Sequence, residues 1–100
     1  MVFGSLITSP RGTLSLQQEL RLANVYLENA YNEDDEDIAL VLCHDTEVSL
    51  SQARKAVKRT EDQNVIEEIA TAYMNLGNLL ESQHRPREAQ AIYMKAEKLG

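Results

Sequence analysis

The stretch from Ala70 to Leu99 constrains the fold of this chain more than any other part of it. Two runs of apolar residues at helical spacing lie on either side of a break at Arg85-Pro86. Pro86 suits the first position of a helix, where its missing backbone N–H costs nothing. We therefore predict two antiparallel helices joined by a tight turn. The apolar positions are Tyr73, Leu76, Gly77 and Leu80 before the break, and Ala89, Ile92, Tyr93 and Ala96 after it.

Small and large residues alternate at the positions where these two helices would touch. Gly77, Ala89 and Ala96 would let the two backbones approach closely, and the larger side chains would fill the space around them. Ridges of one helix can then pack into the grooves of the other.

The stretch resembles one tetratricopeptide repeat (TPR), whose pattern is W-x2-L-G-x2-Y, then A-x3-F, then P, over roughly 34 residues. Leu76-Gly77 and Ala89 match this pattern directly. Tyr73 takes the Trp position, Leu80 the Tyr position, Tyr93 the Phe position and Ala96 a small position that usually follows. The resemblance covers about a third of the chain. It implies an all-α fold of antiparallel helical hairpins arranged as an α-α superhelix.

The rest of the chain is expected to add a first hairpin, for about four helices in all. Ser15 and Gln18 fit a capping box that opens a helix ending near Asn32. Thr60-Glu61-Asp62 would cap a third helix that ends at Ser82, and the fourth runs from Pro86 to about Leu99. The face of the first helix contains Leu16, Leu20, Ala23, Leu27 and Ala30, widened by Leu22, Val25 and Tyr26.

The second helix, over about 35–59, allows two interpretations. An unbroken apolar stripe favours one long helix, with acids at its start and bases at its end, as a helix dipole prefers. Poor helix formers around residues 45–51 favour a turn, which would give five helices. We choose one helix, because neither Gly nor Pro occurs there. The stripe is Ala39, Cys43, Thr46, Leu50, Ala53 and Val57.

One hundred residues allow one domain, with residues 1–13 as a flexible leader and 14–100 as a TPR-like helical domain. The leader contains a few apolar residues that could instead dock on the core. The first hairpin lacks the Leu-Gly pair, so it is a degenerate repeat. About three repeats are usually needed for a stable fold, and this chain has fewer. We therefore expect either that its ends self-associate or that it is a fragment of a larger regulatory or signalling protein.

The net charge of −6 marks an acidic chain, which would be repelled by phosphate backbones, so we expect no nucleic-acid partner. We read Arg54, Lys55, Lys58 and Arg59 as a solvated helix end. No apolar run reaches the length of a membrane span, and no secretory signal is apparent. A lone Cys43 cannot form an internal disulfide, so we expect an intracellular, cytoplasmic location.

We find no catalytic, cofactor-binding or metal-binding pattern. Cys43 and His44 are helix neighbours that point about 100° apart, so they cannot form a nucleophile–base pair. His84 is distant from both. The acidic run 33–37 lacks the spacing of a calcium-binding loop, and it indicates the first turn of a helix.

The resemblance implies a non-catalytic protein–protein interaction module, a scaffold or adaptor whose groove is lined by the first helix of each hairpin. The groove candidates are Thr71, Met74, Asn75, Asn78 and Glu81, with Met74 and Asn78 foremost. Some family members grip a partner's terminal carboxylate with Lys, Arg and Asn side chains. We expect that clamp to be absent here, because Glu81 would repel a carboxylate. The alternatives are a self-associating structural bundle and a small ligand- or metal-binding four-helix enzyme, which would need Glu and Glu-x-x-His on its apolar stripes.

Overall fold

The computed structural model describes residues 15–57 and 63–99, and these residues form four α-helices without a strand. The all-α fold predicted from the sequence is therefore confirmed. The predictions for the leader 1–13, for the cap at Thr60-Glu61-Asp62 and for Gly100 lie outside the described residues. The helices are α2 (Leu16–Asn32), α3 (Glu36–Ala56), α4 (Gln63–Ser82) and α5 (Pro86–Leu99).

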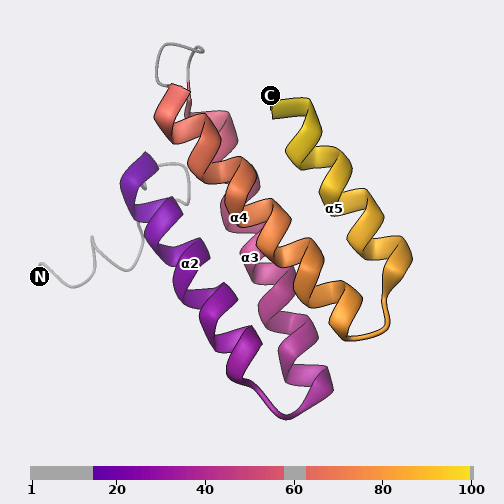
Figure 1. Cartoon of the computed structure of the whole chain (residues 1–100). Coiled ribbons are helices and arrows are strands. Elements are labelled where there is room, and N and C mark those ends of the chain that lie inside the picture. Colours follow the sequence, from indigo (N-terminus) through magenta and orange to yellow (C-terminus); the bar gives the residue numbers. More distant parts are fainter. Residues whose placement is uncertain (1–14, 58–62, 100) are drawn as a thin grey trace, which may run out of the picture.

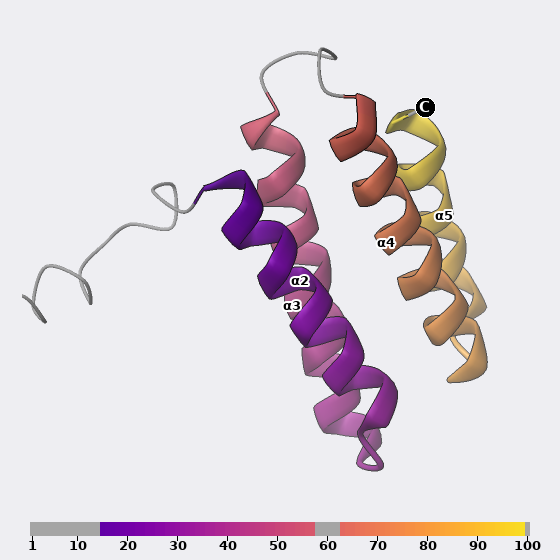
Figure 2. The ribbon, with the colours of Figure 1, turned by 60° about the vertical axis from the view of Figure 1, so that its left-hand side comes forward.

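The helices form two antiparallel hairpins, α2 with α3 and α4 with α5, packed side by side (Figure 1). The helix α4 joins the hairpins, because it contacts both α3 and α2 as well as its own partner α5. Figure 2 shows the resulting two layers, with α2 and α4 in front and α3 and α5 behind. The first helices of the two hairpins are therefore neighbours on one face of the molecule.

Local sequence signals set the N-termini of the first two helices. The Ser15 hydroxyl accepts the Gln18 N–H at 3.2 Å, and Gln18 Oε1 accepts the Ser15 N–H at 2.9 Å, which completes the predicted capping box. Asp35 caps α3 by accepting the N–H groups of Asp37 at 2.9 Å and Ile38 at 3.3 Å. The acidic run thus opens a helix, as expected.

A single helix spans Glu36–Ala56, so the alternative of a turn near residues 45–50 is wrong. The Thr46 hydroxyl donates to the Leu42 carbonyl at 2.8 Å, which satisfies this buried polar group within its own helix. The predicted apolar stripe is buried from Ala39 to Ala53 and faces the rest of the molecule.

The turn between α4 and α5 has the hydrogen bonds of a Schellman motif. The Arg85 N–H donates to the Leu80 carbonyl and the His84 N–H donates to the Glu81 carbonyl, both at 3.0 Å. His84 lies in the left-handed region with φ of 63°, a position where glycine is usual. Pro86 then starts α5, as predicted.

The core forms where the apolar stripes of the four helices meet. Leu50 from α3 and Ile69 and Leu76 from α4 are completely buried, and Ala89 and Ile92 close the core from α5. Full burial of side chains of this size contributes about 1.5–3 kcal/mol each relative to exposure. The two hairpins therefore share one core.

Two details of the helix faces differ from the prediction. Val25, expected to widen the buried face of α2, is 47% exposed, since no described element covers that side of α2. Ala72 and Leu79 are buried although they lie off the predicted face of α4. The reason is that α4 contacts α2 on a second flank, in addition to α3 and α5.

Candidate functional site

A groove runs between α2 and α4, because residues of these two helices line the same two hollows. It consists of two hollows of about 500 Å³ and about 360 Å³. Asn24 of α2 and Asn75 of α4 line both hollows, so the two adjoin. We name these two hollows together the α2–α4 groove.

The larger hollow combines apolar and polar side chains. Leu27 and Tyr31 of α2 and Leu79 of α4 supply apolar surface, while Glu28 and Ser82 supply polar groups. A concave site with an apolar base and a few fixed polar groups is the usual form of a binding site in proteins.

The smaller hollow is more polar. Its walls carry Asn64, Glu67, Glu68 and Thr71 of α4, above Leu20 and Ala72, which are buried. Asn64, Glu67 and Glu68 are exposed to solvent. This end of the groove therefore presents amide and carboxylate groups to whatever enters it.

The structure divides the five groove candidates that the sequence singled out. Thr71, Asn75 and Asn78 line the α2–α4 groove. Met74 is 45% exposed but lines neither hollow, and Glu81 is likewise exposed outside them. Asn75 and Asn78 line a hollow that α2 shares, whereas Glu81 lies beside Tyr93 of α5, which also reaches Asn78.

Tyr93 of α5 holds two of these side chains in place. Its hydroxyl lies 2.6 Å from Asn78 Oδ1 and 2.9 Å from Glu81 Oε1 and can donate its hydrogen to either oxygen. Partial burial, then the hydrogen bond to Glu81 and its negative charge, raise the pKa of Tyr93, so the phenol stays a donor.

The α2 wall of the groove was not anticipated from the sequence. Asn24, Leu27, Glu28 and Tyr31 lie at steps of three, one and three, so they share one flank of α2. That spacing was available in the sequence. The sequence alone does not show that this flank of α2 faces α4, whereas the structure does.

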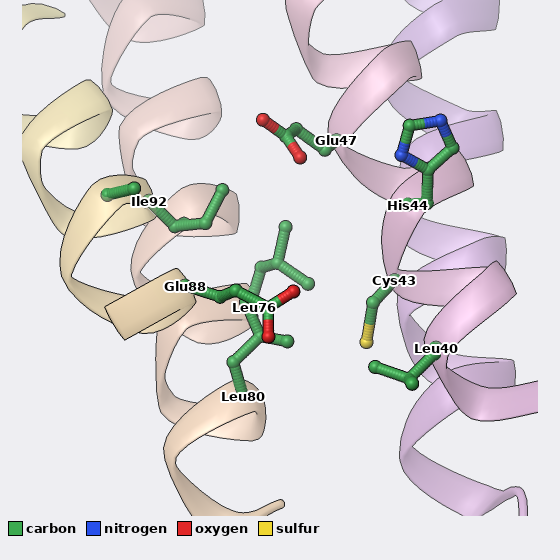
Figure 3. Close-up of a pocket in the computed structure, with 9 residues that line it drawn as sticks. Leu40, Cys43, His44, Glu47, Leu76, Leu80, Glu88 and Ile92 are labelled. Atoms are coloured by element: carbon green, nitrogen blue, oxygen red, sulfur yellow. The ribbon is translucent and has the colours of Figure 1, made fainter. Parts of the chain in front are cut away.

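A second, smaller pocket of about 160 Å³ lies on the other side of α4, between α3 and α5 (Figure 3). Figure 3 shows the Cys43 thiol and the Glu88 carboxylate directed into the space between these helices, with Leu76 and Leu80 behind. Glu47 at its edge forms an ion pair with Lys95 that ties α3 to α5. The pocket therefore lies across the junction of the two hairpins.

The chemistry of this pocket does not favour a reactive thiol. Burial and then the negative charge of Glu88 raise the pKa of the Cys43 thiol, with Arg85 opposing them, so the thiol stays protonated near neutral pH. The thiol donates weakly to Gln83 Oε1 at 4.0 Å. His44 is exposed, and its ring points away from Cys43 (Figure 3). Cys43 thus serves as a small core residue.

Within residues 15–57 and 63–99, no three His, Cys, Asp or Glu side chains are grouped so that they could hold a metal ion. His84 lies in the turn after α4, far along the chain from His44. The same described residues contain no helix that is long and apolar enough to cross a membrane.

Comparisons with protein-family models, with curated proteins and with solved structures gave no match to this chain. The resemblance to a tetratricopeptide repeat stays a prediction from the residues of α4 and α5.

Proposed function

We propose that this chain is a non-catalytic protein-interaction module, a TPR-like scaffold or adaptor that binds an extended segment of a partner protein. One observation carries the proposal: the first helices of both hairpins, α2 and α4, jointly line one groove. In TPR-like proteins this is the surface expected to hold a peptide, and stacked helical repeats commonly present such concave surfaces.

The length of the groove suits a peptide. Its α4 wall runs from Asn64 to Ser82, a rise of 82 − 64 = 18 residue steps, or about 27 Å of helix. An extended chain advances about 3.3 Å per residue, so roughly eight residues of a partner would fill the groove. The shared core of the two hairpins holds its two walls together.

The test is a selection of random peptides of about ten residues on the full chain, followed by affinity measurements by fluorescence anisotropy. Asn75, which lines both hollows, is the position to block, and Asn75→Trp would fill the groove. Met94→Trp is the control, because it places the same side chain at an exposed position of α5.

The proposal predicts micromolar binders whose affinity falls at least roughly tenfold with Asn75→Trp, a loss of about 1.4 kcal/mol, and holds with Met94→Trp. Failure to select any binder, or equal affinity of both variants, would contradict it. A peptide with a free acidic C-terminus should bind poorly, since Glu28 lines the groove and no Lys or Arg does so among the described residues.

A second candidate function is self-association as a structural helical bundle. The outer side of α2 carries a shallow, mainly apolar surface that no described element covers, formed by Gln18, Arg21, Leu22 and Val25. Light scattering behind a sizing column would give twice the 11.3 kDa chain mass if this face pairs with a second copy. Val25→Glu should then restore the monomer, whereas a monomeric wild type would exclude this candidate.

We also infer an intracellular, cytoplasmic site of action. Cys43 is the single cysteine of the sequence and is buried, and a chain whose lone thiol serves as a core residue suits a reducing compartment. Localisation of the tagged full chain by fluorescence microscopy checks this inference.

A further inference from the structure

We propose that the partner segment held in the α2–α4 groove is basic, with two Lys or Arg residues about four positions apart in an extended chain. This inference rests on the proposed function and adds the chemical class of its ligand. Charge complementarity carries it.

Among the residues that the structure describes, the charges that line the groove all have one sign. Glu28 lines the larger hollow, and Glu67 and Glu68 line the smaller one. No Lys or Arg lines either hollow within residues 15–57 and 63–99, and none of the three carboxylates is ion-paired there. Cationic side chains are therefore attracted to both ends of the groove, and anionic ones are repelled from both.

The positions of the carboxylates set the spacing of the cations. Glu28 lies in the same hollow as Asn78, and Glu68 lies ten residues before Asn78 on α4 (78 − 68 = 10). Ten helical residues span about 15 Å. An extended peptide covers this distance in about four to five residues at ~3.3 Å each. Two basic side chains at that spacing could meet Glu28 and the pair Glu67 and Glu68 at once.

The middle of the groove is neutral and suited to a peptide backbone. Asn24 of α2 and Asn75 of α4 line both hollows, and each carboxamide offers both a donor and an acceptor. Amide groups of this kind can hydrogen-bond the backbone N–H and C=O groups of any sequence. The asparagines would thus hold the chain, and the carboxylates would select its charge.

The experiment uses the full chain and four synthetic peptides of ten residues built on one neutral host sequence. The first carries two lysines four positions apart, the second two adjacent lysines, the third two glutamates four positions apart, and the fourth no charge. Calorimetric titration at low and at high salt gives the dissociation constants. The protein variants are Glu28→Gln, the double variant Glu67→Gln with Glu68→Gln, the triple variant, and Glu97→Gln.

Glu97→Gln is the matched control, because Glu97 is an exposed residue of α5 that does not line the groove. It changes the net charge by as much as Glu28→Gln does. Comparison of the two variants separates contact with the groove from attraction by the overall negative charge of the chain.

We expect the peptide with separated lysines to bind most tightly and the glutamate peptide to bind least. Glu28→Gln should weaken the first peptide by about two- to fivefold, the usual effect of one exposed charge pair, and the triple variant should weaken it by roughly tenfold or more. Glu97→Gln should leave the affinity unchanged. High salt should shrink the preference for lysine.

The outcomes separate the two proposals. If neutral and basic peptides bind equally, or if Glu97→Gln matches Glu28→Gln, the basic ligand is wrong although the groove still binds peptides. If the glutamate peptide binds best, the inference is overturned in the same way. If neither these peptides nor any selected random peptide binds, both the inference and the proposed function fail.

Discussion

The aromatic ring of Tyr93 occupies the space into which any side chain at Gly77 would project. An ideal Cβ built on Gly77 would lie 2.7 Å from Tyr93 Cδ1 and closer still to Cε1. Gly77 is in the middle of α4, where glycine costs helix stability, so its presence needs a reason of this kind. The close approach joins α4 to α5, and it also brings the Tyr93 hydroxyl to Asn78 at the edge of the groove.

The first prediction concerns Gly77→Ala. Helix propensity alone would stabilise the chain by about 1 kcal/mol, whereas overpacking costs about 1–3 kcal/mol. Because the Tyr93 hydroxyl donates its hydrogen to Asn78 or Glu81, the ring is held in place. We therefore expect the cost of overpacking to exceed the gain in helix propensity, and the variant to be about 1 kcal/mol less stable in urea unfolding. In a Tyr93→Ala background the ring is absent, and the same change should stabilise. If Gly77→Ala changed the free energy of unfolding in the same direction in both backgrounds, the proposed clash with Tyr93 would be wrong.

Helix bounds were predictable because their causes are local. The capping box of Ser15 and Gln18 and the break before Pro86 each depend on a few consecutive residues, and the stripes of α3 and α4 repeat at helical spacing. The flank on which one hairpin packs against the other is not local. It depends on the angle between helices, so the burial of Ala72 and Leu79 was not foreseen.

The same distinction applies to the candidate site. Thr71, Asn75 and Asn78 could be placed on the outward side of one helix from its period alone, and they line the groove. The α2 wall, with Asn24 and Glu28, required knowledge of which flank of α2 meets α4. Whether these residues bind a ligand stays a prediction.

The second prediction concerns His84, the residue with a left-handed backbone in the turn after α4. An L-residue pays about 1–2 kcal/mol for this conformation, and glycine does not. We expect His84→Gly to stabilise the chain by about 1 kcal/mol, which thermal and urea unfolding would detect. The matched control is Gln83→Gly one residue earlier, which should not stabilise. Destabilisation by His84→Gly would mean that the exposed imidazole makes a contribution that the turn geometry does not explain.

The third prediction is a loss of stability at alkaline pH that depends on Tyr73. Burial first, and then the negative charge of Glu47, raise the pKa of Tyr73 to about 12, with Arg54 opposing them, from its ordinary value of 10.0. The folded state thus favours the neutral phenol. Its contribution is complete below pH 10, the unfolded value, and is lost as the pH rises from 10 to about 12.

Tyr73→Phe removes this titration, so its free energy of unfolding should fall less than that of the wild type across the same pH window. Tyr31→Phe serves as the control, because Tyr31 is 74% exposed and its change should leave the wild-type pH profile intact. Urea unfolding at a series of pH values gives the three curves. Parallel curves for wild type and Tyr73→Phe would show that burial does not hold this phenol neutral.

The central claim is that α2 and α4 form one binding groove for a partner segment, and amide chemical-shift mapping of the full chain tests it most directly. The peptide with two lysines four positions apart is titrated into isotope-labelled protein. The account predicts that the shifts concentrate along Asn24, Glu28, Asn75 and Asn78 and spare the α3–α5 pocket around Leu40 and Glu88. Shifts that gather at that pocket, or that leave the α2–α4 groove unchanged at saturation, would contradict it.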